Sequence, residues 1–207
     1  EFMDSLQKLA SAGNATPLAL GTADMWEATQ VIFTGMGPNF WGGEKARHGL
    51  IQGTRKFTDP EFIRAWRMMG QLKPYMHPKQ NQMSNNDMQL LFATGNAAIY
   101  PTGSWDIDFL RSTSFAYKKQ IDMGVFKPPV EHKNQRCHLS VHPDFGIGVN
   151  KNTRHPEAAQ KFMDWLASAE FAQLLTDTLS GFFSLSNHRV QVNDPLSQDM
   201  MNWRKDC

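Results

Sequence analysis

The chain lacks a dominant charge, a set of cysteines and any long apolar run. Its 207 residues include 21 Lys or Arg and 20 Asp or Glu, a formal net charge of +1. That balance gives no electrostatic footprint for nucleic acid or an anionic membrane. No run approaches the roughly 18 apolar residues of a membrane span. Cys137 and Cys207 are too few for a disulfide framework, and their separation does not decide whether they pair.

Common catalytic fingerprints are also missing. There is no GxSxG, no P-loop and no dinucleotide fingerprint, because GIGVN at residues 146–150 lacks the third glycine. Internal repeats and low-complexity tracts are absent as well. With 41% hydrophobic and 20% charged residues, the composition is that of a soluble globular protein of one large or two small domains.

The N-terminus carries no basic-then-apolar leader of the kind found in signal peptides. Residues 1–3 (EFM) lead almost directly into a helical pattern. We therefore expect this chain to be a fragment, or to have a processed start.

Apolar spacing and capping residues predict helices that alternate with short strands. We expect helices at residues 4–13, 24–33, 60–72, 84–95, 105–117, 155–175 and 195–203. Strands are expected at residues 16–20, 97–100, 123–126 and 145–149, and loops at 35–53, with one helical turn, and at 127–144. The alternation favours a helix-rich α/β fold.

Residues 95–106, GNAAIYPTGSWD, combine a strand, a tight turn and a tryptophan. Gly103 can adopt a positive φ, and Ser104 can cap a helix that starts at Trp105. The flat indole suits the C–H surface of a sugar ring, and Asp106 can accept hydrogen bonds from hydroxyl groups. A structural role for Trp105 in the core is an equal alternative.

Three other tryptophans invite the same question. Trp26 falls in the first turn of a helix after a strand, as Trp105 does, and Trp41 lies in the glycine-rich stretch at 35–53. Trp66 follows the apolar stripe of the helix predicted at 60–72, so we expect it in the core.

The order of several segments resembles a known family. GNAAIYPTGSW, DMGVFKPP, FGIGVN, HPEAAQKFMDWLAS and GFF follow one another as in the carbohydrate-binding proteins of bacterial ABC importers. These belong to the extracellular solute-binding family that includes maltose-binding protein. The resemblance runs from about residue 4 to 181, and TPLALGTADMWEA at 16–28 resembles the start of the family's C-terminal lobe.

The resemblance implies the C-terminal lobe of a type II periplasmic binding protein fold, plus a segment returning toward a missing N-terminal lobe. Residues 1–144 would form the ligand platform, 145–180 the hinge strand and helices of the other lobe, and 181–207 a return segment with a terminal helix. The resemblance implies Trp26 and Trp105 as ligand residues, and then Trp41, whose loop has no firm alignment with the family. We expect Glu27, Gly103, Ser104 and Asp106 to belong to the same ligand site. Sugar and the importer's membrane subunits are the implied partners. A full-length protein would be periplasmic or extracellular, and no cofactor is implied.

Half of a two-lobed cleft is expected to bind sugar weakly or not at all, since closure draws on contacts from both halves. The amphipathic segment at 155–175 would lack its usual partner. We expect a homodimer or swapped assembly that covers Phe162, Leu166 and Leu174. A remnant reused as an interaction module is a second interpretation.

Two chemical alternatives remain open at this level. Glu27, Glu44, Asp106 and Asp108 could supply an acid and a base for glycoside hydrolysis, although sequence spacing cannot establish such a pair. Ligand types suited to zinc occur together, but their spacing matches no strong template. They are Cys137, His138, His142 and Asp144. We expect neither catalysis nor a metal site.

Overall fold

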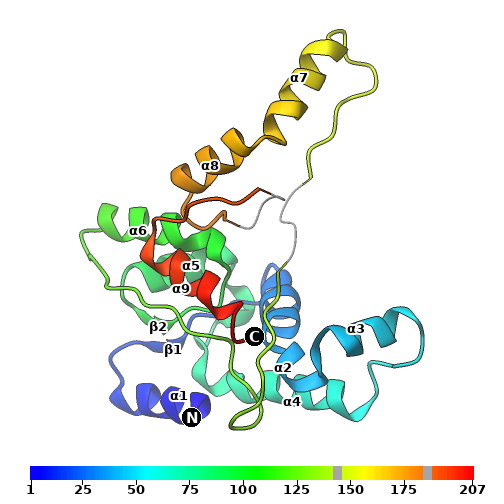
Figure 1. The fold of residues 1–207 in the computed structure, drawn as a ribbon. Helices are drawn as coiled ribbons and strands as arrows, with labels where there is room; N and C mark the ends of the chain where they lie inside the picture. The colour runs from blue at the N-terminus through cyan, green and yellow to red at the C-terminus, as the bar shows by residue number, and fades with distance from the viewer. Residues whose placement is uncertain (142–145, 184–187) are drawn as a thin grey trace.

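The computed structural model describes residues 1–141, 146–183 and 188–207. Its α-helices are α1 (Phe2–Ala12), α2 (Pro38–Trp41), α3 (Gly43–Ile51), α4 (Pro60–Leu72), α5 (Asn85–Ala93), α6 (Ile107–Ala116), α7 (Pro156–Leu166), α8 (Ala169–Thr178) and α9 (Pro195–Trp203). The π-helix η1 spans Glu27–Met36, and the short 3-10 helices are η2 (Lys73–Tyr75), η3 (Gln80–Gln82) and η4 (Ser104–Asp106). The strands are β1 (Thr16–Leu18) and β2 (Ala97–Ile99) (Figure 1).

The two strands lie parallel and put their carboxyl ends at the same edge. Thr16 pairs with Ala97, and Leu18 pairs with Ile99. The backbone N–H of Ala19 extends the ladder by donating to the carbonyl oxygen of Ile99 over 2.7 Å. Residues that follow β1 and residues that follow β2 therefore emerge side by side.

Two apolar clusters hold this part of the chain together. The first joins α1, β1, η1 and α4 through fully buried side chains such as Leu6, Leu18 and Ile32. The second gathers aromatic rings of η1, α2 and α4, among them Phe33 and Phe62. Clusters of this kind supply most of the stability of short helices, which are marginal in isolation.

The glycine-rich stretch at 35–53 is helical, so the predicted loop is wrong. Pro38 starts α2 with a pre-set φ, and Gly42 ends it in the left-handed region at φ 96°. The chain then enters α3 at once, with Gly43 also at positive φ (64°). Glycine here separates two short helices instead of maintaining an open loop.

Two predicted strands do not form. Residues 123–126 carry no strand, and neither do residues 146–149, where Ile147 and Val149 are about half exposed. Phe145, the first residue of that second prediction, lies outside the described residues. An apolar run becomes a strand only when a neighbouring strand takes up its backbone hydrogen bonds, and no described segment pairs with either run.

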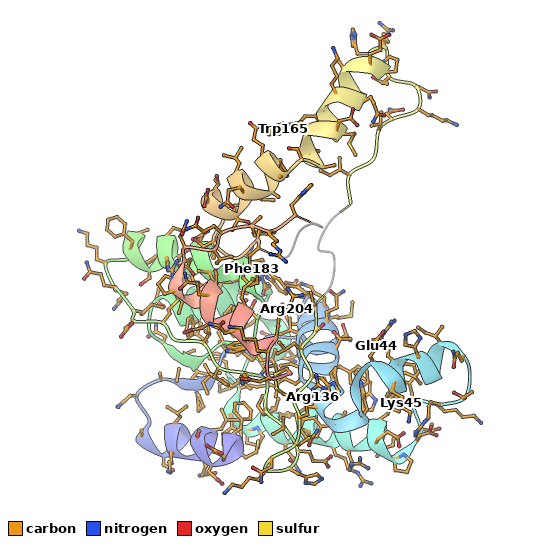
Figure 2. All side chains as sticks on the ribbon, in the orientation of Figure 1. Glu44, Lys45, Arg136, Trp165, Phe183 and Arg204 are labelled. Carbon is orange, nitrogen blue, oxygen red and sulfur yellow. A yellow bond between two sulfur atoms is a disulfide. The ribbon has the colours of Figure 1, made fainter. Side chains whose placement is uncertain are left out.

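Helices α7 and α8 project away from the rest of the molecule (Figure 1). No side chain of α7 is buried, and Phe162 is 53% exposed. Trp165 lies on this projecting arm (Figure 2), and the centroid of its ring is 4.8 Å from that of Phe171. The arm returns to the body through α8, whose Ala172 is buried. Much of the apolar surface of the arm therefore stays exposed, Leu174 included.

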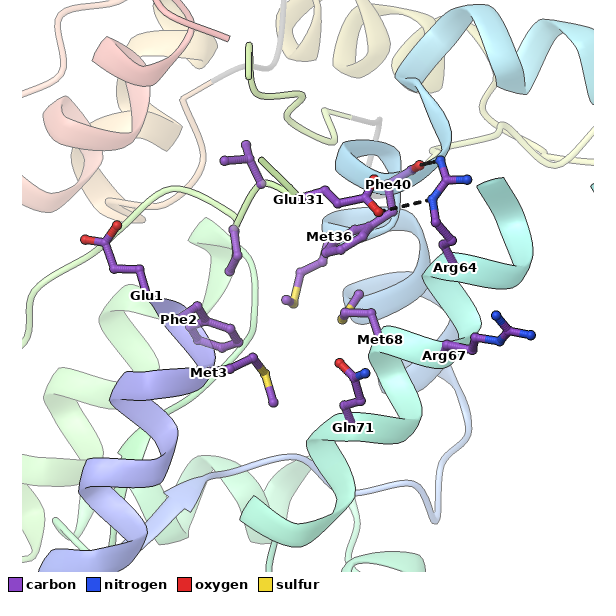
Figure 3. Close-up of a pocket in the computed structure, with 12 residues that line it drawn as sticks. Glu1, Phe2, Met3, Met36, Phe40, Arg64, Arg67, Met68, Gln71 and Glu131 are labelled. Atoms are coloured by element: carbon purple, nitrogen blue, oxygen red, sulfur yellow. Dashed lines mark hydrogen bonds and ion pairs between the residues drawn. The ribbon is translucent and has the colours of Figure 1, made fainter. Parts of the chain in front are cut away.

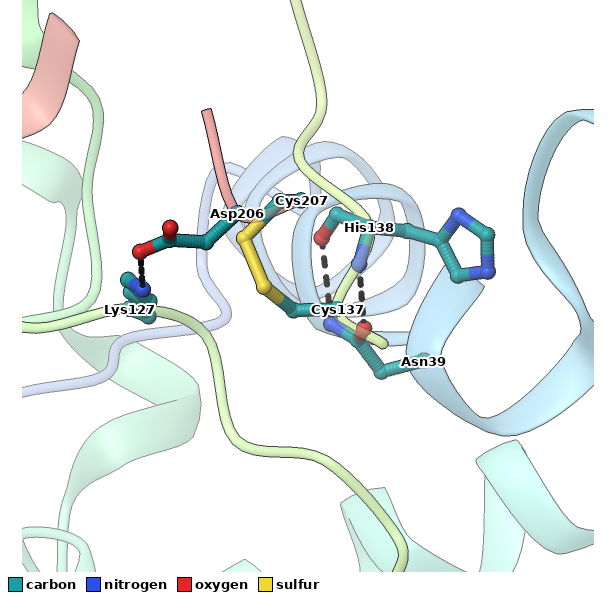
Figure 4. The surroundings of a disulfide bond; sticks show 6 residues. All are labelled: Asn39, Lys127, Cys137, His138, Asp206 and Cys207. Carbon is teal, nitrogen blue, oxygen red and sulfur yellow. Dashed lines mark hydrogen bonds and ion pairs between the residues drawn. A yellow bond between two sulfur atoms is a disulfide. The ribbon is translucent and has the colours of Figure 1, made fainter. Parts of the chain in front are cut away.

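Cys137 and Cys207 form a disulfide, which answers the question that their spacing left open (Figure 4). Their Cα atoms lie 4.6 Å apart. Beside them the buried Asn39 donates to the carbonyl oxygen of His138 and accepts from its backbone N–H over 2.6 Å. Residues 137 and 138 are thus fixed both to α2 and to the chain just past the end of α9.

None of the helices described is both long and apolar enough to cross a membrane.

Candidate functional site

The carboxyl edge of the two strands brings together the two segments that carry Trp26 and Trp105. Asp24, which follows β1, accepts a hydrogen bond over 2.8 Å from the backbone N–H of Asn85, the first residue of α5. The hydroxyl of Tyr100, which follows β2, lies 2.8 Å from the side-chain oxygen of the same Asn85. Ligands of open α/β folds bind at such an edge, so both tryptophans come from the expected part of the fold.

Asp106 is the hub that shapes the turn after β2. It is only 3% exposed and accepts hydrogen bonds from Gln89 at 2.7 Å, Thr102 at 2.5 Å and Tyr100 at 3.1 Å. Burial raises the pKa of Tyr100, and the nearby carboxylates of Asp106 and Glu27 raise it further, so Tyr100 remains a donor. Hydrogen bonds from within the protein therefore occupy the carboxylate of Asp106.

Trp105 folds back over Gly103. A Cβ atom at Gly103 would lie 1.9 Å from a carbon of the indole ring. Gly103 has φ −106°, so the expected positive φ is wrong, and the glycine serves close approach instead. Its missing side chain gives the six-membered ring of the tryptophan a place to lie.

Ser104 does not cap a helix, contrary to expectation. Its side chain accepts no capping hydrogen bond, and Gly103 stands at the N-cap of η4. The Ser104 hydroxyl instead donates to the carbonyl oxygen of Gly181 over 2.6 Å. A Cβ at Gly181 would lie 1.7 Å from the Ser104 carbonyl oxygen, so the two backbones touch. This long-range contact replaces the predicted local one.

Glu27 is a buried carboxylate at the start of η1. Its side chain is 2% exposed, and neither oxygen has a hydrogen-bond partner among the described residues. Burial raises the pKa of Glu27, its own backbone N–H opposes the rise, and the nearby Asp24 carboxylate adds to it. Trp26, immediately before it, is half-buried. A buried carboxylate without a donor is the kind of acceptor that a hydroxyl-bearing ligand can satisfy.

The other two tryptophans exchange their expected places. Trp41 is 8% exposed, with ring centroids 4.4 Å from Phe33 and 5.3 Å from Phe62. Trp41 also lines a second groove, beside Asn39, Glu61 and Gln135. Trp66, expected in the core, is 44% exposed and stacks on Phe33 at 4.2 Å. Both rings contact Phe33, and only the fold decides which of them is buried.

A groove that sequence reasoning did not find lies between α1, η1 and α4 (Figure 3). Its volume is about 410 Å³, and one rim carries the hydrogen-bonded ion pair of Arg64 with Glu131 at 3.1 Å. The other lining residues are Glu1, Phe2, Met3, Met36, Phe40, Arg67, Met68, Gln71, Pro129 and Val130. They come from separate segments with no common motif, so no local pattern reveals the groove. None of the predicted ligand residues lines it.

Several residues considered for the two alternative chemistries are engaged in other contacts. The described residues hold no group of three or more His, Cys, Asp or Glu placed to bind a metal, and the Cys137 sulfur is engaged in the disulfide. His142 and Asp144 lie outside the described residues. Of the four carboxylates considered for catalysis, Asp106 holds its turn, and Glu44 pairs with Arg47 on the exposed face of α3. Asp108 accepts from the backbone of Ser180.

Sequence comparison adds the family. The profile of the bacterial extracellular solute-binding proteins matches residues 1–173. The chain belongs to this family. It is a family of binding proteins and not of enzymes, and a periplasmic or extracellular location follows for its full-length members. No curated protein matches the chain in a sequence search.

Solved structures of sugar-binding proteins share the fold. A "Chitin oligosaccharide binding protein" is 23% identical with a TM-score of 0.73 over 99% of this chain, and the bacterial solute receptor AcbH is 16% identical with 0.72 over 100%. RafE, solved with raffinose, is 19% identical with 0.68 over 95%. This chain covers 51% of each of these structures, so it spans about half their length. The helix-rich α/β fold of part of a periplasmic binding protein is confirmed.

Proposed function

We propose that this chain supplies one wall of a carbohydrate-binding cleft for ABC-type import. One observation carries the proposal: Trp26 and Trp105 each follow a strand at the same carboxyl edge, and both are half-buried. Their indoles offer stacking surface for pyranose rings. The sugar ligands of RafE and AcbH, and the chitin oligosaccharides of the first relative, support this choice of ligand class.

The proposed site residues have two kinds of task. Trp26 and Trp105 would stack on sugar, and Glu27 would accept hydroxyl hydrogen bonds once the first turn of η1 gives access to its oxygens. Gly103, Ser104 and Asp106 shape the turn that presents Trp105. Trp41 would contribute less than Trp26 and Trp105, because it is buried and its ring packs on Phe33 and Phe62.

The test measures sugar binding by wild type and by Trp105→Ala with saturation-transfer NMR. The sugars are raffinose, galactose, chitobiose and xylobiose. We expect at least one sugar to give a signal in wild type that Trp105→Ala reduces at least about tenfold. Trp165→Ala, on the projecting arm, removes the same side chain elsewhere and should leave the signal unchanged. A silent wild type, or equal signals from wild type and Trp105→Ala, would overturn the proposal.

The binding is proposed to be weak, with Kd on the order of millimolar. Closure of a two-lobed protein gains affinity from contacts on both sides of the ligand, and this chain provides one side. Calorimetric titration that gave a micromolar Kd for the monomer with any of the four sugars would contradict this.

The division of the chain follows the same proposal. Residues 1–144 would form the ligand platform, residues 145–180 the part that belongs with the opposite lobe, and residues 181–207 the return segment and terminal helix. In the full-length protein the importer's membrane subunits would be partners.

A reused interaction module is the second candidate function, favoured by the exposed apolar face of α7.

Self-association of this chain is proposed to run through that face. Phe162 and Leu174 are about half exposed on the arm, and covering them removes apolar surface from water. Light scattering should give the mass of a dimer, and Phe162→Ser should shift it toward the monomer. Lys161→Ser changes the adjacent exposed position and serves as the control. A monomer mass for wild type at every concentration would rule the dimer out.

A further inference from the structure

Residues 180 and 181 lie against the turn that carries Trp105 and the start of α6. Besides the Ser104 contact to Gly181, the backbone N–H of Ser180 donates to Oδ2 of Asp108 over 2.5 Å. Gly181 is buried and leaves no room for a Cβ against the Ser104 carbonyl. A segment more than 70 residues away in sequence therefore covers one side of the turn.

Helix α9 fixes that segment from the other side. Ser197, in its first turn, is fully buried, and its hydroxyl lies 2.5 Å from the carbonyl oxygen of Ser180. The backbone N–H of Ser197 donates to Oδ1 of Asp194 over 2.9 Å, and Oδ2 of Asp194 pairs with Arg111 at 2.5 Å. Arg111 lies on α6, the helix that follows Trp105. The contacts thus form a closed circuit from the turn through residue 180 and α9 back to α6.

The far end of α9 is fixed as well. Cys207 forms the disulfide to Cys137, and Asp206 pairs with Lys127 (Figure 4). The residue after Cys137 is tied in turn to the buried Asn39 by two hydrogen bonds. The helix is therefore anchored at both ends, by polar contacts at its start and by a covalent bond just past its end.

We propose that α9, anchored by the Cys137–Cys207 disulfide, is a clamp that positions the Trp105 turn, with Ser197 and Asp194 as its positioning residues. The ligand role of the turn rests on the proposed function, but the mechanical coupling does not. A turn held in place before the ligand arrives spares the entropic cost of ordering it on binding. The clamp itself never touches the ligand.

Hydrogen exchange, read by mass spectrometry without sugar, tests the coupling. We expect Ser197→Ala in the oxidised protein to speed amide exchange in residues 103–108 and 180–183 about tenfold, the effect of losing one buried hydrogen bond. Reduction of the wild-type disulfide should speed exchange in the same two segments. Peptides from α4 should keep their rates in both cases. Ser11→Ala removes an exposed hydroxyl that bonds within α1 and should change nothing near the turn.

Each contrary outcome is decisive. If reduction speeds exchange only in residues 127–141 and 204–207, or speeds α4 equally, the disulfide does not position the turn and the proposal fails. If Ser197→Ala leaves residues 103–108 unchanged, the clamp contact is not transmitted and the proposal also fails.

Sugar titration of wild type, set beside the exchange rates of Ser197→Ala, then separates the two proposals. Faster exchange at the turn with no sugar bound by wild type would uphold the clamp and overturn the ligand role. Sugar binding by wild type with an unchanged turn in Ser197→Ala would do the reverse.

Discussion

At the scale of single residues, the turn after β2 depends on two glycines, whose lack of a side chain leaves space for neighbouring groups. Gly103 makes room for the ring of Trp105, and Gly181 allows two backbones to touch. Neither glycine is required for a positive φ: Gly103 has φ −106°, and Gly181 is not among the positive-φ residues. Steric space therefore explains both glycines, which means that alanine at either position should act on the neighbour and not on the local backbone.

Gly103→Ala should displace Trp105. The new Cβ would meet the indole at 1.9 Å, so the ring has to leave its place while the backbone can stay. We expect a change in tryptophan fluorescence and a loss of whatever sugar binding the chain has. Gly70→Ala, where a Cβ meets nothing within 4 Å, is the control. A fluorescence spectrum identical to wild type would show that the ring does not depend on this glycine.

Glu27 should make stability depend on pH. Its pKa in the folded protein lies above the ordinary value of 4.5, so the folded state binds the proton more tightly than the unfolded state. The free energy of unfolding therefore falls as the pH rises through the interval between those two pKa values, and stays lower above it. Glu27→Gln removes this loss and should unfold at higher denaturant concentration than wild type at pH 7.

The comparison needs a second carboxyl change. Glu157→Gln, in the exposed first turn of α7, should leave the pH dependence of unfolding as in wild type. Parallel curves for wild type and Glu27→Gln across pH 4 to 8 would contradict the assignment to Glu27.

At the scale of elements, α5 links local sequence signals to the site. Ser84 and Asp87 form a capping box, since the Ser84 hydroxyl accepts from the N–H of Asp87 and the Asp87 carboxylate accepts from the N–H of Ser84. The hydrogen bonds from Ser84 also hold the pKa of Asp87 below its ordinary value. The helix so started brings Asn85 and Gln89 to Tyr100 and Asp106. The N-cap of α5 and the turn after β2 are therefore linked through this helix.

Ser84→Ala should lower the free energy of unfolding by about 1 kcal/mol, the usual cost of losing an N-cap. Urea unfolding followed by circular dichroism measures it. Ser5→Ala removes an exposed hydroxyl inside α1 and should cost far less. Equal midpoints for Ser84→Ala and wild type would mean that the cap does not contribute.

Several elements could be predicted because their signals are local. The Pro60 start of α4, the capping box of α5 and the proline start of α9 lie within a few residues of the helices they define. The strands at 123–126 and 146–149 failed for the opposite reason, since a strand needs a partner that its own residues do not supply. The helix expected at 24–33 forms as the π-helix η1 three residues later, after Met25 at φ 64°.

At the scale of the whole molecule, one covalent bond closes a large part of the chain. The disulfide joins residues 70 positions apart and fastens α9 across the body of the protein. The projecting α7–α8 arm lies inside this loop (Figure 1), and no side chain of α7 is buried. The bond therefore restricts the unfolded chain over a segment that contributes little core of its own.

Replacing both cysteines by serine should lower the free energy of unfolding by about 4 kcal/mol, from the loop-closure entropy of about 70 residues. Thermal unfolding of wild type with and without reducing agent should show the same loss. The double serine variant should be indifferent to reducing agent, which controls for its other effects. An unchanged midpoint on reduction would contradict the expected contribution.

The sequence by itself determined the capped helices, the recurrence of a tryptophan after a strand in two segments, and the resemblance to extracellular solute-binding proteins. These features depend on residues close together in the chain or on the order of short segments. Only the tertiary structure decided that Trp41 is buried and Trp66 is not, that Ser104 bonds to Gly181, and that Cys137 pairs with Cys207. Each of those outcomes is a contact between distant segments, and its energy appears only when the fold brings both partners together.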